Sequence, residues 1–89
     1  MLDQTLRALG DPTRREILRV LRGGDCTAGE IASRFTMTAA SVSHHLAVLR
    51  EAGLVSVERN GRNQVYSLQT TVFQEFLQEM AHLFGKEDR

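Results

Sequence analysis

Three adjacent residues of this 89-residue sequence, Ser43, His44 and His45, have side chains of the types that could do chemistry together. A serine and a histidine act as nucleophile and base only when both converge on one substrate atom. The surrounding pattern predicts a helix, and consecutive residues of a helix point in different directions. The sequence also has no glycine-rich phosphate loop, metal-ligand set or carboxylate pair. We therefore expect no enzyme activity, no cofactor and no metal site.

The helix that carries these residues is predicted over 39–52. Val42, Leu46 and Leu49 follow one another at i, i+4 and i+7, which is the spacing of a buried helical stripe. Thr38 is a favourable N-cap, and Gly53 is placed to end the helix. The opposite side of this helix should therefore face outwards.

That outward side can supply hydrogen bonds to DNA. It is small or polar, and no acidic residue occurs between Thr38 and Arg50. Small neutral side chains let a helix enter the major groove, where serine and histidine can bond base edges or phosphate. An ordinary exposed face of a bundle helix is the alternative interpretation. The predicted DNA contacts on this helix are Thr38, Ala40, Ser41, Ser43, His44 and Ala47.

A predicted hairpin directly after the helix gives a second DNA-binding hypothesis. Residues 54–59 and 64–68 have strand-forming composition, and Asn60-Gly61 favours a two-residue type I′ turn. This turn would place Arg59 and Arg62 opposite each other, where like charges repel unless an anion lies between them. DNA phosphate or a narrow minor groove would supply that anion, whereas arginines that extend into water would not need one. The predicted contacts are Arg59, Asn60, Arg62 and Asn63.

The remaining elements must hold this helix and hairpin in one domain, residues 1–89. Helix start signals and apolar spacing predict further helices at residues 2–9, 12–22, 28–35 and 70–84. The third begins at a capping-box pattern, Thr27 to Glu30, and should bury Ile31, Ala32 and Phe35. The expected fold is mainly α with a β-hairpin wing, a winged helix-turn-helix in the order α-α-α-α-β-β-α. Its helix-turn-helix would occupy residues 28–52 and its wing residues 54–69.

A small basic cluster, Thr13, Arg14 and Arg15, follows the helix start signal at Asp11 and Pro12. Helix N-termini donate N–H groups to phosphates, so this cluster is a candidate phosphate anchor. Local ion pairs with Asp11 and Glu16 are an equally weighted alternative.

The charge distribution is compatible with DNA binding although the formal net charge is zero. Residues 1–69 carry nine Lys/Arg and seven Asp/Glu, a net charge of +2, whereas residues 70–89 carry two and four, a net charge of −2. No apolar run reaches the roughly 18 residues of a membrane span and no signal-peptide pattern is present, so we expect a cytoplasmic protein without a membrane span. The single cysteine, Cys26, excludes an intrachain disulfide and should pack as a small apolar residue in a loop.

Three strings of the sequence resemble the ArsR/SmtB-type family of small bacterial repressors. They are Ala8–Leu18, which contains Gly-Asp-Pro-Thr-Arg, Ser41–Val55, which contains Ser-His-His-Leu, and Glu58–Leu68 at the hairpin. The sequence is most similar to the SdpR-like autorepressor branch, which lacks metal-binding motifs. The resemblance implies a homodimer that binds double-stranded operator DNA at an imperfect inverted repeat and blocks a promoter.

The resemblance also implies that the first and last helices form the dimer interface. The last helix has more apolar residues than one narrow stripe needs, which independently suggests a partner. The expected interface residues are Leu2, Leu6, Phe73, Phe76, Leu77, Met80 and Phe84.

The sequence departs from the metal-sensing members of the family. Where those members carry a cysteine-containing box, this chain has Glu30 to Ser33, and His82 is the only histidine of the last helix. Glu75, Glu79 and His82 share one side of that helix and are interpreted as a solvated face. Two alternatives stay open: a ligand- or metal-responsive sensor of this family with an unknown small-molecule inducer, and a winged-helix protein-interaction module, which should show acidic or apolar residues on the outward face.

Overall fold

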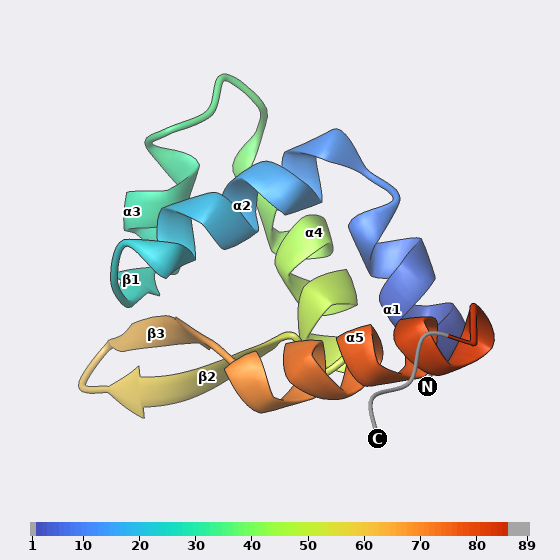
Figure 1. Cartoon of the computed structure of the whole chain (residues 1–89). Helices are drawn as coiled ribbons and strands as arrows, with labels where there is room; N and C mark the ends of the chain where they lie inside the picture. The colour runs from blue at the N-terminus through green and yellow to red at the C-terminus, as the bar shows by residue number, and fades with distance from the viewer. Residues whose placement is uncertain (1, 86–89) are drawn as a thin grey trace.

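The computed structural model describes residues 2–85 and shows a mainly α-helical fold with a small antiparallel sheet (Figure 1). The elements are α1 (Leu2–Leu9), α2 (Pro12–Arg22), β1 (Cys26–Thr27), α3 (Ala28–Ala32), α4 (Ala39–Glu51), β2 (Val55–Asn60), β3 (Asn63–Leu68) and α5 (Thr70–Leu83). The hairpin β2–β3 extends to one side of the molecule, and α1 and α5 lie together at the other (Figure 1). The predicted winged-helix fold class is confirmed. None of the helices in residues 2–85 is long and apolar enough to cross a membrane.

Three helices begin at the N-caps that the sequence predicts. The Asp11 carboxylate accepts a hydrogen bond from the Arg14 backbone N–H at 3.0 Å, and the Thr38 hydroxyl accepts one from Ser41 at 3.1 Å. Thr27 and Glu30 form a reciprocal capping box, with bonds of 2.8 and 3.1 Å. Each cap satisfies backbone donors that a helix start otherwise leaves unpaired.

The end of α4 sets the position of the hairpin. Gly53 has φ of 78°, a left-handed conformation that glycine adopts without steric cost. The Gly53 N–H donates to the Arg50 carbonyl at 2.9 Å, and the Leu54 N–H donates to the Leu49 carbonyl at 3.0 Å. This is the hydrogen-bond pattern of a Schellman motif. It reverses the chain so that β2 begins four residues after the last residue of α4.

The core lies between the helices and the sheet. Its largest fully buried side chains are Ile17, Ile31, Val42, Leu46, Leu49 and Leu54. Three of them come from α4, as the sequence predicts, so one side of this helix is fixed in the core and the opposite side is exposed.

Two sequence predictions about the segment before α4 are wrong. Residues Cys26 and Thr27 do not form a loop but a short strand, paired with Tyr66 and Val65 of β3, so the sheet order is β1-β3-β2. A two-residue strand is too short to show an alternating pattern. The third helix ends at Ala32, not at Phe35, and a turn of i to i+3 hydrogen bonds follows it. The Ser33 hydroxyl donates to the Glu30 carbonyl at 2.8 Å there, and such bonds compete with helix continuation.

The predicted hairpin register is wrong by one residue. Asn60 pairs with Asn63, so the two-residue loop is Gly61-Arg62, and Arg59 lies opposite Gln64 instead of Arg62. A type I′ turn needs positive φ at both loop residues, but only Gly61 has it, at 65°. Glycine at the first loop position with a negative φ at the second fits a type II′ turn. The repulsion expected between directly opposed Arg59 and Arg62 is therefore absent.

Candidate DNA-binding interface

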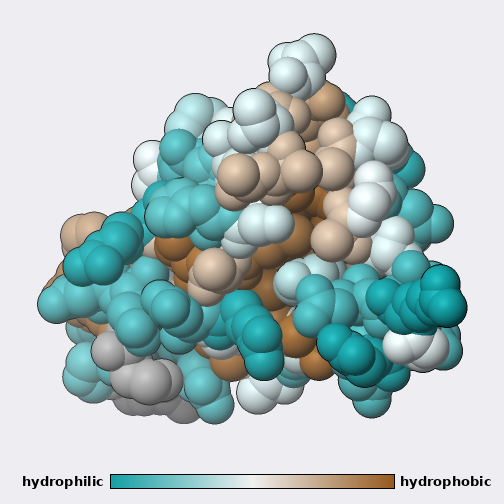
Figure 2. Space-filling model, turned by 180° about the vertical axis from the view of Figure 1, so that it is seen from behind, coloured by the Kyte–Doolittle hydropathy of each residue, from teal (hydrophilic) through white to brown (hydrophobic). Residues whose placement is uncertain are grey.

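The outward side of α4 is exposed along its whole length. All six residues predicted to contact DNA from this helix are exposed: Thr38, Ala40, Ser41, Ser43, His44 and Ala47. Figure 2 shows pale and brown residues running down the middle of the molecule, where α4 lies in Figure 1, between hydrophilic residues on both sides. An exposed helix face without acidic side chains over most of its length can approach the edges of base pairs.

A groove next to this face adds residues that sequence reasoning missed, Arg50 and Tyr66 and the acidic Glu51 at the end of α4. It has a volume of about 410 Å³, and Ser43, Leu46 and Ala47 complete its lining. Arg50 follows Ser43 by seven residues and Ala47 by three, so helical spacing alone could have placed it on this face. Tyr66 comes from β3, and only the folded structure brings it to the groove.

The tip of the hairpin carries the four predicted wing contacts. Arg59, Asn60, Arg62 and Asn63 are all exposed. Within residues 2–85, the guanidinium groups of Arg59 and Arg62 make no hydrogen bond or ion pair. Two free cationic side chains near the loop can reach phosphate oxygens even though they do not face each other across the strands.

The predicted phosphate anchor has a different setting. Arg14 is partly buried, and its Nε and Nη2 donate to the carbonyls of Ala8 and Arg7 at 2.8 and 3.0 Å. Arg15 donates to the Leu9 carbonyl at 2.8 Å. Both arginines therefore bind the C-terminal carbonyls of α1, a role the sequence did not indicate. Contact of Thr13, Arg14 or Arg15 with phosphate stays a prediction.

The ion-pair alternative for this cluster is not supported within residues 2–85. Glu16 pairs with Arg19 at 2.7 Å, and no ion pair joins Arg14 or Arg15 to Asp11 or Glu16. The hydrogen bond from the Arg14 backbone N–H lowers the pKa of the Asp11 carboxyl from its ordinary value, and it outweighs burial, which acts in the opposite direction. The positive charge of the Arg14 guanidinium, and that of His45 when its ring is protonated, lower the pKa of Asp11 further.

The last helix lies on the surface with its apolar residues uncovered. No residue of α5 is fully buried, and Phe73, Leu77, Leu83 and Phe84 are exposed, as is Leu6 of α1. The rings of Phe73 and Phe76 stack with centroids 6.1 Å apart. Leu2, Phe76 and Met80 of the expected interface are half-buried.

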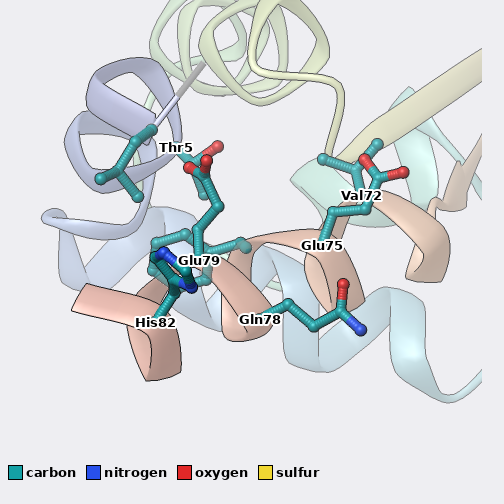
Figure 3. Close-up of a pocket in the computed structure, with 8 residues that line it drawn as sticks. Thr5, Val72, Glu75, Gln78, Glu79 and His82 are labelled. Carbon is teal, nitrogen blue, oxygen red and sulfur yellow. The ribbon is translucent and has the colours of Figure 1, made fainter. Parts of the chain in front are cut away.

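A cleft of about 540 Å³ lies between α1 and α5 (Figure 3). In Figure 3 the Glu79 carboxylate points towards Thr5 of α1, whereas Gln78 points away from that helix. Glu75, Glu79 and His82 all line the cleft. Across residues 2–85, no group of three or more His, Cys, Asp or Glu side chains is placed to hold a metal ion.

Comparisons with known proteins link these features to transcription. The family described as "Bacterial regulatory protein, arsR family" matches residues 11–57 of this chain. The chain is 44% identical over 87 residues to the transcriptional repressor SdpR of Bacillus subtilis, covering 98% of this chain and 97% of that protein. It is also 44% identical over 75 residues to the HTH-type transcriptional regulator NmtR of Mycobacterium tuberculosis, covering 84% of this chain and 62% of that protein.

Solved structures give the same picture. An ArsR-like transcriptional regulator from Rhodococcus sp. RHA1 superposes with a TM-score of 0.83 at 28% identity, covering 94% of this chain and 78% of that one. A possible transcriptional regulator for arsenical resistance superposes with a TM-score of 0.79 at 30% identity over all of both chains.

Proposed function

This chain belongs to the ArsR family of bacterial regulatory proteins and is a DNA-binding transcriptional regulator, and we propose that it acts as a homodimeric repressor. In this proposal two α4 helices bind an inverted repeat in double-stranded DNA and block a promoter. The observation that carries it is the exposed side of α4, which has no acidic residue from Thr38 to Arg50, next to a hairpin whose tip has two arginines without an ion pair among residues 2–85.

The two elements would have different tasks on DNA. Ser43 and His44 lie on the exposed side of α4, where they can bond base edges in the major groove and so read sequence. Arg59 and Arg62 have no ion pair within residues 2–85, so they would contact phosphate and supply affinity that depends little on sequence.

The exposed apolar side chains of α5 and Leu6 of α1 support the proposed dimerisation. Apolar patches of this kind on a small domain usually mark an interaction site. A two-fold interface built from them would bring the same residues of both protomers together. The two recognition helices would then lie about 34–36 Å apart, which matches half-sites in successive major grooves.

The experiment that tests the proposal is selection of genomic fragments with the purified protein, followed by fluorescence anisotropy on the selected duplex. We expect Ser43→Ala or His44→Ala to lower discrimination against substituted operators by about 1–3 kcal/mol for each hydrogen-bonded base that the variant no longer reads. Thr71→Ala, an exposed α5 substitution away from this face, is the control and should leave discrimination unchanged. If the Ser43 and His44 variants discriminate as well as the wild type, α4 does not read the bases.

A further inference from the structure

One partly buried side chain, that of Arg14, joins three helices. It belongs to α2, and its Nε and Nη2 hold the last carbonyls of α1 at 2.8 and 3.0 Å. Its Nη1 lies 3.2 Å from Nδ1 of His45 in α4, a residue 31 positions away in the sequence. The same imidazole nitrogen lies 3.8 Å from the Asp11 carboxylate.

Resting on the proposed function, we propose that Arg14 is a positioning residue for DNA binding. Because its guanidinium contacts both the end of α1 and His45, it fixes the recognition helix α4 relative to α1. Arg14 itself need not touch DNA, because Nε, Nη1 and Nη2 are all engaged within the protein.

The position of His45 on α4 makes this contact matter for the recognition face. Its side chain is only 16% exposed, whereas His44 beside it is exposed on the side proposed to read DNA. The two rings lie 5.8 Å apart. A rotation of α4 that releases His45 from Arg14 would therefore turn His44 and Ser43 away from their places.

The contact between Arg14 and His45 is a hydrogen bond only when Nδ1 of His45 carries no proton. The reason is that arginine donates hydrogen bonds and cannot accept them. The planar guanidinium presents donors in a fixed fork, which can serve two carbonyls and an imidazole together. A lysine ammonium at the same place keeps the charge but has no such fork, so Arg14→Lys is the informative substitution.

Arg19 offers a matched control. It lies on α2 as Arg14 does, its side chain is 60% exposed, and its guanidinium pairs with Glu16 at 2.7 Å. Within residues 2–85 its side chain makes no hydrogen bond or ion pair with α4. Arg19→Lys thus exchanges a guanidinium for an ammonium on the same helix while leaving the link to α4 intact.

The test measures affinity for the selected duplex at several salt concentrations, with protein well above its dimer dissociation constant and folding checked by circular dichroism. We expect Arg14→Lys to weaken specific binding about tenfold with an unchanged salt slope, since the number of neutralised phosphates stays the same. Arg19→Lys should stay within about twofold of the wild type, because an exposed ion pair contributes little.

The His45 variants keep the proposal falsifiable if Arg14→Lys does not fold. His45→Gln retains an acceptor for Arg14 and should keep most of the affinity, whereas His45→Leu should weaken binding about tenfold. Wild-type affinity in Arg14→Lys or in His45→Leu overturns the proposal. So does a salt slope reduced by about one in Arg14→Gln, because a slope that falls when the charge is removed marks a direct phosphate contact. Failure of the proposed function is distinct, because then the wild-type protein itself selects no duplex.

Discussion

Replacing Leu77 by glutamate should split the proposed dimer without unfolding the protomer. Leu77 is 51% exposed in the single chain, and no residue of α5 is fully buried, so the fold does not depend on this side chain. Full burial of a leucine is worth about 1.5–3 kcal/mol, so covering the exposed half contributes about 1 kcal/mol per protomer. A two-fold interface counts each residue twice, which gives about 2 kcal/mol, or about a 30-fold change in the dimer dissociation constant.

The glutamate adds to this effect, because it would place two carboxylates in an apolar contact without partners. Sedimentation equilibrium should therefore show a dissociation constant raised by at least about 30-fold, with an unchanged circular dichroism spectrum. DNA affinity should fall at protein concentrations below the new constant and recover above it.

Gln78→Glu is the matched control, since it adds the same charge to the same helix at a position turned about 100° away from Leu77 around the helix axis. It should dimerise as the wild type does. A Leu77→Glu protein that stays dimeric at nanomolar concentration would show that α5 pairs through another surface, or not at all.

Three further predictions address the wing, the end of α4 and the dependence of the free energy of unfolding on acidic pH. Arg62→Ala should weaken binding to all duplexes alike. It should also make the slope of log affinity against log salt less steep by about 0.9 for each phosphate that is no longer neutralised. Arg19→Ala removes a charge that is already paired with Glu16, so it should change neither the affinity nor the slope. Gly53→Ala should lower the free energy of unfolding by about 1–2 kcal/mol in urea titrations, because φ of 78° is unfavourable for any residue with a Cβ; equal stability would refute that cost. Because the folded-state pKa of Asp11 is lowered, its stabilisation is complete above the ordinary pKa of an aspartate and is lost as the pH falls through the lowered one. The stability difference between the wild type and Asp11→Asn should therefore shrink on acidification, and a difference that grows would contradict the sign.

The sequence predicts well what is decided locally. The caps at Asp11, Thr27 and Thr38 depend on side chains within three residues of the helix start, and all three form. The stripe of Val42, Leu46 and Leu49 depends only on helical spacing, and it is buried as expected. These local rules are sufficient to predict the exposed face of α4.

What the sequence could not predict depends on pairing between distant segments. The strand at Cys26 exists because β3 offers it a partner 40 residues away, and its two residues show no pattern of their own. The hairpin register is set by which loop residue takes positive φ, and Asn60-Gly61 and Gly61-Arg62 are both acceptable to local rules. The contact between Arg14 and His45 likewise has no local signature, because the two residues lie on different helices and meet only in the folded chain.

The same contacts explain how a chain with no net charge can bind a polyanion. The guanidinium groups of Arg14 and Arg15 bond the carbonyls of α1, and Arg19 is paired with Glu16, so these side chains also have contacts within the fold. The arginines of the wing have no partner within residues 2–85. Since a charge acts on DNA through its local field and not through the sum over the chain, these arginines next to a helix face without acidic residues from Thr38 to Arg50 matter more than the total. The division of the arginines between fold and surface is thus what allows a neutral domain to present a cationic edge to DNA.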